Sequence, residues 1–223
     1  MNVIILSAGR GERLRPLTDH SPKPLLQAGN KRLIEYTIDA LVKAGLNNIV
    51  INTAYLAEQF PQKLGDGKRY NATITYSDEQ AGGLETAGGI INALTLLGNE
   101  PFLVVNGDIW TDYPFEQLHN FKLAQGSLGH LVFVTNPEHN LTGDFSISSG
   151  VISTDDSNKL TYSGIAIFHP ALFSDLEVQR LALKPLLLEA IAKQQLTGEH
   201  YRGEWSDIGT VERLQQLINQ LER

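Results

Sequence analysis

The sequence predicts an α/β fold in which a doubly wound, mainly parallel sheet carries added β-hairpins toward its C-terminal end. Over residues 1–135, short β-branched apolar runs alternate with stretches of helical periodicity, and this alternation is typical of β-α-β units. From about Thr142 onward, short strand-like segments are joined by turn sequences, which favours hairpins. No internal repeat, low-complexity segment or linker interrupts the sequence, so we expect residues 1–223 to form a single domain.

Four apolar runs are expected to form the buried strands of the first part. Each run is rich in β-branched residues and is bounded by Gly, Asn or Pro, as central parallel strands commonly are. Because helices cover both faces of such strands, their side chains do not alternate between apolar and polar. The runs are residues 3–6, 48–52, 102–106 and 131–135.

Four segments with apolar residues at helical spacing are expected to pack around these strands. Each of the first two segments is followed by a glycine, which is a common stop signal for a helix. The last segment has a stripe of leucine and isoleucine side chains along one face, which predicts a helix packed on the body of the domain. The predicted helices are residues 33–44, 86–97, 181–193 and 211–222.

The added hairpins are expected between the second and third of these helices. Residues 144–148, 151–153 and 160–168 have the length and composition of short strands. Ser149-Gly150 and the polar segment 155–158 separate them, and such residues are typical of tight turns.

The charge of the chain is distributed unevenly. The formal net charge is −7, but residues 1–32 contain six basic and two acidic side chains, a local net charge of +4. The remaining residues are therefore strongly acidic, which disfavours nucleic acid as a partner, because nucleic-acid-binding domains usually carry an extended basic surface. A compact basic cluster in an acidic chain instead indicates one small anionic ligand.

Composition excludes several other classes of protein. The chain is 42% hydrophobic and 19% charged and has no cysteine, which favours an ordered domain and excludes disulfides, cysteine–zinc sites and thiol nucleophiles. The apolar run at residues 3–6 is too short for a signal peptide, and no run reaches 18 apolar residues. We therefore expect a cytoplasmic protein without a membrane partner. Its oligomeric state is not determined by these features, and they are compatible with a monomer.

A glycine-rich segment follows the first predicted strand. Gly9 and Gly11 lie in residues 7–18, which we call the phosphate loop, because glycines let backbone N–H groups approach phosphate oxygens closely. Arg13 and Lys23 would add positive charge at the same oxygens. A dinucleotide fingerprint would need a third glycine where Leu14 stands, and no Gly-Lys-Ser/Thr tripeptide of a Walker A loop occurs.

The segment Leu-Ser-Ala-Gly-Arg-Gly-Glu-Arg-Leu-Arg-Pro-Leu-Thr of residues 6–18, followed by Ser-Pro-Lys-Pro-Leu at 21–25, resembles the signature of the sugar-phosphate nucleotidylyltransferases. The resemblance implies a Rossmann-like domain that joins a nucleoside triphosphate to a sugar 1-phosphate and releases pyrophosphate. It also implies that Arg13 and Lys23 are catalytic, with Arg13 at the pyrophosphate and Lys23 at the α-phosphate. The residues it implies for nucleotide binding are Ala8, Gly9, Gly11, Glu12, Arg13, Lys23 and Asn106.

Two aspartates are candidate metal ligands. Asp108 follows the predicted strand 102–106, and Asp207 lies in Trp-Ser-Asp-Ile-Gly-Thr. Their spacing alone is equally consistent with a turn aspartate at Asp108 and a helix N-cap at Asp207, a role that Thr210 could also take. The resemblance implies instead that both hold one Mg²⁺, an ion that prefers carboxylates, water and phosphate oxygens.

A second glycine-rich loop, residues 80–89, leads into the predicted helix 86–97. The resemblance implies that this loop contacts the nucleobase, with Gln80 and Gly83 as the candidates, and that Glu85 contacts the sugar phosphate. The alternative for Glu85 and Thr86 is a place in the first turn of the helix, where a negative charge and a hydroxyl are both favourable.

The sugar side is implied by two further segments. Asp144, in Thr-Gly-Asp-Phe, would accept hydrogen bonds from sugar hydroxyls, and Gly164, in Ser-Gly-Ile, would leave room for the sugar. Many members of the family carry Glu-Lys-Pro shortly before the second segment, but residues 156–162 lack it. An unmodified glucose 1-phosphate is therefore a less secure expectation for the substrate.

The segments 84–89, 105–112, 143–145 and 198–203 of this short chain most resemble those of the family members that act on N-acetylmuramate 1-phosphate in bacterial peptidoglycan recycling. This resemblance implies UTP as the second substrate and UDP-N-acetylmuramate as the product. Arg202 could then pair with the lactyl carboxylate, or it could be a solvated surface residue. The alternatives are uridylyl, thymidylyl or guanylyl transfer to another hexose 1-phosphate. A non-catalytic nucleotide-sugar-binding subunit is disfavoured, because Arg13, Lys23, Asp108 and Asp207 are all present.

Overall fold

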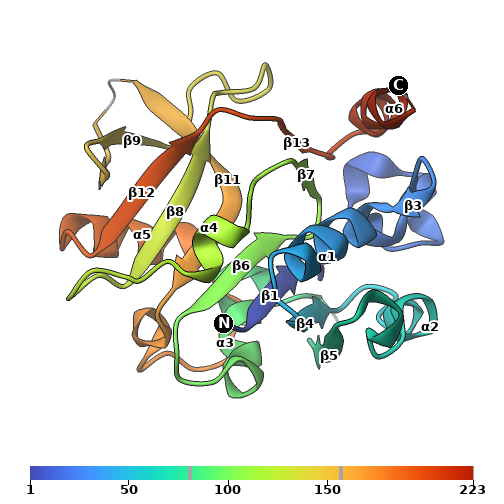
Figure 1. The fold of residues 1–223 in the computed structure, drawn as a ribbon, viewed down its shortest axis with the longest axis horizontal. Coiled ribbons are helices and arrows are strands. Elements are labelled where there is room, and N and C mark those ends of the chain that lie inside the picture. The colour runs from blue at the N-terminus through green and yellow to red at the C-terminus, as the bar shows by residue number, and fades with distance from the viewer. Residues whose placement is uncertain (80–81, 156–157, 223) are drawn as a thin grey trace.

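The structure is a computed structural model that describes residues 1–79, 82–155 and 158–222 (Figure 1). The strands are β1 (Val3–Leu6), β2 (Gln27–Ala28), β3 (Lys31–Arg32), β4 (Asn48–Thr53), β5 (Thr73–Asp78), β6 (Phe102–Asn106), β7 (Ile109–Thr111), β8 (Gly129–Val134), β9 (Phe145–Ser148), β10 (Val151–Ser153), β11 (Lys159–Phe168), β12 (Leu196–Tyr201) and β13 (Trp205–Asp207). The helices are α1 (Leu33–Lys43), α2 (Gln59–Leu64), α3 (Glu85–Leu97), α4 (Glu116–His119), α5 (Leu183–Ala192) and α6 (Val211–Leu221), with short 3-10 turns at Glu12–Leu14, Leu17–Asp19, Lys23–Leu25, Lys68–Tyr70 and Pro170–Phe173.

One nine-stranded sheet runs through the molecule in the order β5-β4-β1-β6-β11-β8-β12-β10-β9. The first four strands are parallel, whereas β11 is antiparallel to both of its neighbours β6 and β8. The predicted α/β fold with added hairpin strands is thus confirmed, and the sheet becomes mixed beyond β6. The predicted hairpin of β9 and β10 is present, and Ser149 and Gly150 at its turn both have positive φ, as a type I′ turn requires.

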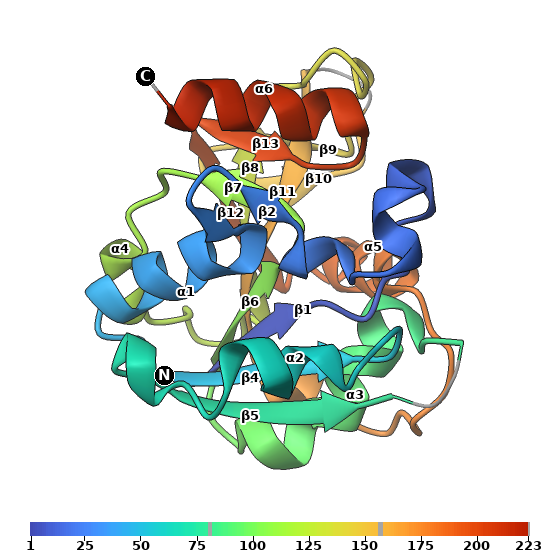
Figure 2. The same ribbon diagram turned by 90° about the vertical axis from the view of Figure 1, so that its right-hand side faces the viewer.

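Helices cover both faces of the parallel strands, as a doubly wound sheet requires. Val3 and Ile5 of β1 face α1, whereas Ile4 between them faces α3. Figures 1 and 2 show α1 and α3 on opposite sides of β1. Because successive side chains of a strand point to opposite faces, an uninterrupted apolar run such as β1 buries side chains in two separate cores.

The C-terminal part of the sheet closes into a ring of five strands. The order β11-β8-β12-β10-β9 is completed by pairing of β9 with β11. Phe133, Phe145 and Tyr162 meet in the apolar core beside these strands. The ring centres of Phe145 and Tyr162 each lie 6.4 Å from that of Phe133. A Cβ on Gly198 of β12 would lie 2.8 Å from the Phe133 ring, so this strand position accommodates the ring only as glycine.

A third apolar cluster attaches α6 to the rest of the domain. Leu214 and Leu217 pack with Leu14, Leu33 and Ile208, while Ile218 and Leu221 lie at the edge of the cluster. The predicted apolar stripe of the last helix is therefore confirmed. Figure 2 shows α6 above β13 and the β2–β3 hairpin, so the chain end covers the segment that follows the phosphate loop.

Two strands of the nine-stranded sheet, β5 and β12, were missing from the sequence prediction. β5 has the sequence Thr-Ile-Thr-Tyr-Ser-Asp, and β12 has the sequence Leu-Thr-Gly-Glu-His-Tyr. Neither contains a continuous apolar run that would predict a buried strand. Both form because they add to existing strands: β5 pairs with β4, and β12 pairs in parallel with β8. Their β-structure is a consequence of tertiary pairing rather than of local composition.

Among the residues that the structure describes, no helix is both long enough and apolar enough to cross a membrane.

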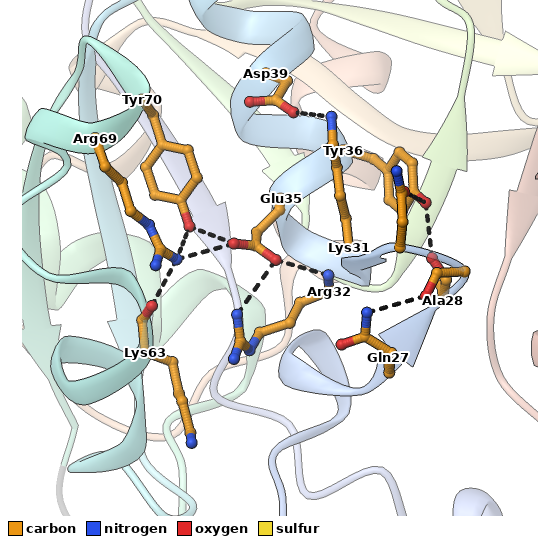
Figure 3. A network of polar contacts seen from close by, with 12 residues as sticks. Gln27, Ala28, Lys31, Arg32, Glu35, Tyr36, Asp39, Lys63, Arg69 and Tyr70 are labelled. Carbon is orange, nitrogen blue, oxygen red and sulfur yellow. Dashed lines mark hydrogen bonds and ion pairs between the residues drawn. The ribbon is translucent and has the colours of Figure 1, made fainter.

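The buried carboxylate of Glu35 joins α1 to the 3-10 turn at Lys68–Tyr70 (Figure 3). It accepts hydrogen bonds from the Tyr70 hydroxyl at 2.5 Å, from Arg69 at 2.9 Å and from the Arg32 backbone N–H at 2.7 Å. Burial by itself raises the pKa of Glu35, but the hydrogen bonds from Tyr70 and Arg32 outweigh it, and the pKa lies below its ordinary value. The ionised form is therefore the one that stabilises the fold.

Replacing Glu35 with glutamine should lower the free energy of unfolding by about 1–3 kcal/mol at pH 7, because an amide cannot accept all three hydrogen bonds. The lowered pKa means that the native carboxylate contributes fully above about pH 4.3, the ordinary pKa of glutamate, and loses this contribution as the pH falls through its native pKa. Urea unfolding at pH 7 and pH 3 measures the effect. An equal difference between the two proteins at both pH values would contradict the prediction.

Candidate active site

A cavity of about 860 Å³ opens at the carboxyl ends of the parallel strands. Leu6 at the end of β1 pairs with Asn52 of β4 on one side and with Asn106 of β6 on the other, so three strand ends form one row. This is the edge at which open α/β sheets bind ligands. The predicted site residues that line the cavity are Ala8, Gly9, Gly11, Glu12, Arg13, Lys23, Gly83, Glu85, Asn106 and Asp108.

The phosphate loop is held in a compact conformation by Gly11 and Thr18. Gly11 has a φ of 68°, and a Cβ there would lie 2.9 Å from the Cβ of Lys23. Only glycine combines this backbone conformation with so close an approach. The Thr18 hydroxyl donates a hydrogen bond to the Gly11 carbonyl oxygen at 2.9 Å. The loop therefore brings its backbone and the Lys23 segment to the same wall of the cavity.

Lys23 and Asp108 form an ion pair inside the cavity. The Lys23 Nζ lies 2.5 Å from Asp108 Oδ2, and only 10% of the lysine side chain is exposed. The structure thus joins a predicted phosphate ligand to a predicted metal ligand, 85 residues apart in the chain. Asp108 lies in the turn between β6 and β7, and Lys23 is its charge partner there.

Asp207 is the other predicted metal ligand, and two basic side chains surround it. Its Oδ1 lies 2.6 Å from Arg213 Nη1 and 2.8 Å from His139 Nε2. The N-cap of α6 is Thr210, whose side chain accepts a hydrogen bond from the Arg213 backbone N–H. Thr210 therefore has the capping role that was considered for Asp207. The Asp207 carboxylate instead contacts the side chains of Arg213 and His139.

The two aspartate segments lie side by side. The Ile208 backbone N–H donates to the Asp108 carbonyl oxygen at 2.7 Å, and Asp207 pairs with Ile109 across the β13–β7 ladder. Within the described ranges, no group of three or more His, Asp or Glu side chains could hold a metal ion. Carboxylates on two neighbouring segments nevertheless match the donor types that Mg²⁺ prefers, since this ion takes its remaining ligands from water and substrate phosphates.

Arg13 reaches from the phosphate loop toward the segment before α6. A Cβ on Gly209 would lie 3.0 Å from Arg13 Nη2 and 2.3 Å from Arg213 Nη2. Two guanidinium groups thus lie beside Gly209, next to Asp207. Arg13 is exposed, as a group that meets a mobile anion must be, and it lines the cavity.

Asn106 and Gly164 are in direct contact. A Cβ on Gly164 would lie 2.4 Å from Asn106 Nδ2, and Gly164 has a φ of 81° where the pairing of β11 with β8 shifts register. Gly164 was expected to leave room for the sugar. In the structure, the space it leaves holds the Asn106 side chain, which lines the cavity.

The second glycine-rich loop contributes Gly83 and Glu85 to the cavity wall. Gln80, the other residue expected at the nucleobase, lies outside the described residues. Glu85 is the first residue of α3, and its Oε1 lies 3.0 Å from Arg180 Nε. Glu85 therefore lies in the first turn of the helix, as the alternative interpretation expected, and it also borders the cavity.

Asp144 and Arg202 do not line this cavity. Asp144 Oδ2 accepts a hydrogen bond from the Tyr162 backbone N–H at 2.9 Å, and its own N–H donates to the Leu160 carbonyl oxygen at 2.8 Å. Asp144 thus supports the backbone at the start of β11. Arg202 follows β12 and is exposed.

Two buried side chains in the cavity wall were missed by the sequence prediction. Asn52 is 2% exposed and Glu79 is 8% exposed, and both line the cavity. Burial raises the pKa of Glu79, and hydrogen bonds from Leu84 and Asn52 oppose that shift. Both residues lie at carboxyl ends of parallel strands. Asn52 ends the predicted strand 48–52, so the reasoning that identified Asp108 applies to it directly, whereas Glu79 follows β5, which was not predicted.

A profile of the nucleotidyl transferase family matches residues 2–223. An N-acetylmuramate alpha-1-phosphate uridylyltransferase of Neisseria meningitidis serogroup B is 46% identical over 222 residues, which cover 97% of this chain and 96% of that protein. A mannose-1-phosphate guanylyltransferase catalytic subunit beta of Xenopus tropicalis is 33% identical over 222 residues. This chain spans only 61% of the length of that second relative.

Solved structures share the fold at lower identity. A Bacillus anthracis structure in complex with sucrose, assigned to glucose-1-phosphate thymidylyltransferase, has a TM-score of 0.88 at 21% identity and covers 99% of this chain and 94% of its own. HddC from Yersinia pseudotuberculosis, complexed with GMP-PN, has a TM-score of 0.81 at 19% identity and covers 99% of both chains. The fold, the family profile and the 46% identical relative agree, and the chain belongs to the nucleotidyl transferase family, whose substrates are a nucleoside triphosphate and a sugar 1-phosphate.

Proposed function

We propose that this protein transfers a uridylyl group from UTP to N-acetylmuramate 1-phosphate, giving UDP-N-acetylmuramate and pyrophosphate. The observation that carries the proposal is the 46% identity to the Neisseria meningitidis uridylyltransferase over nearly the full length of both chains. The cavity at the carboxyl ends of β1, β4 and β6 supports it, because a glycine-rich loop, Lys23, Arg13 and Asp108 line it, and the Asp108 segment is hydrogen-bonded to the segment that carries Asp207. Residues 1–223 are proposed to act as one catalytic domain, since one nine-stranded sheet connects strands from β1 to β12 along the described parts of the chain.

In this proposal, an oxygen of the sugar 1-phosphate attacks the α-phosphorus of UTP in line. The bond between the α-phosphorus and its bridging oxygen breaks, and pyrophosphate leaves. No protein nucleophile is needed, because such transfers depend mainly on positioning and on stabilisation of charge. Lys23 binds the α-phosphate and Arg13 the pyrophosphate. The backbone of Ala8, Gly9 and Gly11, together with Glu12, surrounds the phosphates, and Asn106 and Gly83 border the nucleotide.

Nucleotidyl transferases generally use a divalent metal ion, and Mg²⁺ fits the residues present here. Asp108 and Asp207 would hold it, because their segments are hydrogen-bonded neighbours and carboxylate oxygens suit this hard cation. When bound, Mg²⁺ supplies positive charge that reduces the repulsion between the two anionic substrates. Lys23 pairs with Asp108, and Arg213 with Asp207, so each carboxylate keeps an adjacent cation that orients it.

A panel assay tests the proposal. The purified protein is incubated with Mg²⁺, one of several nucleoside triphosphates and one of several sugar 1-phosphates, and released pyrophosphate is measured. We expect rapid release with UTP and N-acetylmuramate 1-phosphate, and release at least ~10-fold slower with glucose or mannose 1-phosphate, since such selectivity needs only one or two differential contacts. Activity with UTP only when a glucose or mannose phosphate is supplied would refute the proposed sugar. Release with GTP or dTTP in place of UTP would refute the proposed nucleotide.

A further inference from the structure

We propose that Asn52 and Glu79 form a positioning relay, which holds the phosphate loop and residues 82–89 of the second glycine-rich loop at one separation, so that both ends of the nucleotide meet a preorganised site. The proposal rests on the function proposed above and adds two positioning residues to it. Neither residue is placed at the reacting atoms. Their effect is exerted through the two loops that they connect.

Three hydrogen bonds connect the loops through these side chains. The Ser7 backbone N–H, at the start of the phosphate loop, donates to Asn52 Oδ1 at 2.6 Å. Asn52 Nδ2 donates to Glu79 Oε1 at 2.6 Å, and the Leu84 backbone N–H donates to Glu79 Oε2 at 2.7 Å. Asn52 lies on β4, between β1 and β5 in the sheet. The relay therefore crosses the ends of three adjacent strands, from β1 across β4 to β5.

The direction of each hydrogen bond in the relay is determined by the backbone. Ser7 offers an N–H donor, so Asn52 must turn its carbonyl oxygen toward it, and this places the Asn52 amide NH₂ at Glu79. Leu84 offers a second N–H donor to the other oxygen of Glu79. Both oxygens of Glu79 therefore face donors, and the carboxylate form, which only accepts hydrogen bonds, accepts one at each oxygen.

Close packing leaves the relay a single arrangement. A Cβ on Gly89 would lie 2.4 Å from Glu79 Oε1 and 2.7 Å from Asn52 Nδ2, so the backbone of α3 lies directly against the pair. Ser7 and Asn52 are buried, 3% and 2% exposed. Leu84 is the N-cap of α3, and the positive end of a helix favours a carboxylate at this place. Loops fixed in this way lose less conformational entropy when a ligand binds to both.

The hydrogen-bond pattern specifies a pair of substitutions that should fail singly and succeed together. In Asn52→Asp, an added carboxylate oxygen faces the carboxylate of Glu79. In Glu79→Gln, the new NH₂ faces either the NH₂ of Asn52 or the N–H of Leu84. In the double variant, the aspartate introduced at position 52 accepts from Ser7 and from the introduced glutamine, whose carbonyl oxygen accepts from Leu84. The double variant thus restores every hydrogen bond and moves the negative charge from position 79 to position 52.

Binding is measured by isothermal titration calorimetry on the whole protein with Mg²⁺, first with UTP and separately with pyrophosphate. We expect each single variant to bind UTP at least ~10-fold more weakly and the double variant to bind it within about threefold of the wild type, because coupled hydrogen bonds are not additive. Pyrophosphate contacts the phosphate loop alone, so its affinity should stay within about twofold in all variants. A loop that was simply damaged would lose both ligands.

Two matched controls separate the relay from general effects on folding. Glu35→Gln removes a buried carboxylate that also accepts several hydrogen bonds but does not line the cavity. This substitution should lower the thermal midpoint without changing UTP affinity. Asn92→Asp alters an amide on α3 that donates to Ser77 and to the Asp78 carbonyl oxygen, and it should also leave UTP affinity unchanged. The thermal midpoint of every variant is recorded beside its Kd.

The inference is overturned if the single variants bind UTP as the wild type does, if pyrophosphate binding falls together with UTP binding, or if the double variant binds no better than the singles. A double variant that fails to fold also overturns it, since its hydrogen bonds should match those of the wild type. A wild-type protein that binds another triphosphate in preference to UTP corrects the proposed nucleotide, and the relay is then measured with that triphosphate. A wild type that binds none overturns the proposed function and this inference with it.

Discussion

Replacing Lys23 or Arg13 with alanine should lower turnover at least ~100-fold, which is the usual effect of removing one group that stabilises charge in a transition state. Lys23 is buried at the cavity wall, beside the phosphate loop. Arg13 extends from that loop toward Gly209. Initial rates of pyrophosphate release at saturating substrates measure the effect on each variant.

Two basic residues nearby are controls for this prediction. Arg15 lies in the same loop and pairs with Asp19 at 2.8 Å, and Lys31 pairs with Asp39 at 2.6 Å. Neither lines the cavity, and exposed pairs of this kind contribute little to stability. Arg15→Ala and Lys31→Ala should therefore keep turnover within about twofold of the wild type. Near-normal rates in both Lys23→Ala and Arg13→Ala would remove these two residues from the proposed mechanism.

Replacing Asp108 or Asp207 with asparagine should also lower turnover at least ~100-fold and should raise the Mg²⁺ concentration needed for half-maximal rate. The amide is nearly isosteric but lacks the negative charge that attracts a divalent cation. Rates are measured over a Mg²⁺ titration at fixed UTP and sugar 1-phosphate. The titration distinguishes loss of a metal ligand from loss of a fold contact, because the second would lower the rate without shifting the Mg²⁺ dependence.

Asp112 provides the matched control for this second prediction. It lies just after β7, and its Oδ1 accepts hydrogen bonds from the Tyr201 hydroxyl at 2.5 Å and from the Glu204 backbone N–H at 2.7 Å. Asp112→Asn should lower the thermal midpoint and leave the Mg²⁺ dependence unchanged. An unaltered Mg²⁺ dependence in both Asp108→Asn and Asp207→Asn would show that these carboxylates are not metal ligands.

Most of the regular structure could be predicted because it depends on local sequence. The run at β1 and the first four residues of β6 are continuous and apolar, and glycine stands at the C-cap of α3 and directly after the C-cap of α1. Each of these signals is read within about a dozen residues. The small strands β2, β3, β7 and β13 have two or three residues each, which is too short for a periodic pattern, and they form only because distant segments pair.

The candidate site was predicted in part. Residues within local motifs could be predicted, whereas residues placed by the pairing of distant strands could not. The phosphate loop, Lys23 and Asp108 lie in dense motifs and all border the cavity. Asn52 and Glu79 have no motif of their own, and their place in the cavity wall depends on the alignment of β4 and β5 with β1. Asp144 was expected to contact the sugar, whereas in the structure its carboxylate accepts a hydrogen bond from the Tyr162 backbone N–H. Roles for these residues stay predictions until the variants are measured.

The sequence by itself determined the fold class, the family resemblance and the position of the positive charge, because each depends on residues close together in the chain. Only the tertiary structure brought Asp207 beside Asp108, paired Lys23 with Asp108 and connected Ser7 to Leu84 through Asn52 and Glu79. Except for the bond between Glu79 and Leu84, which are five positions apart, these contacts join residues tens of positions apart, and strand order and register determine their partners. Local propensity carries no information about strand order, so these contacts could be known only after the sheet was assembled.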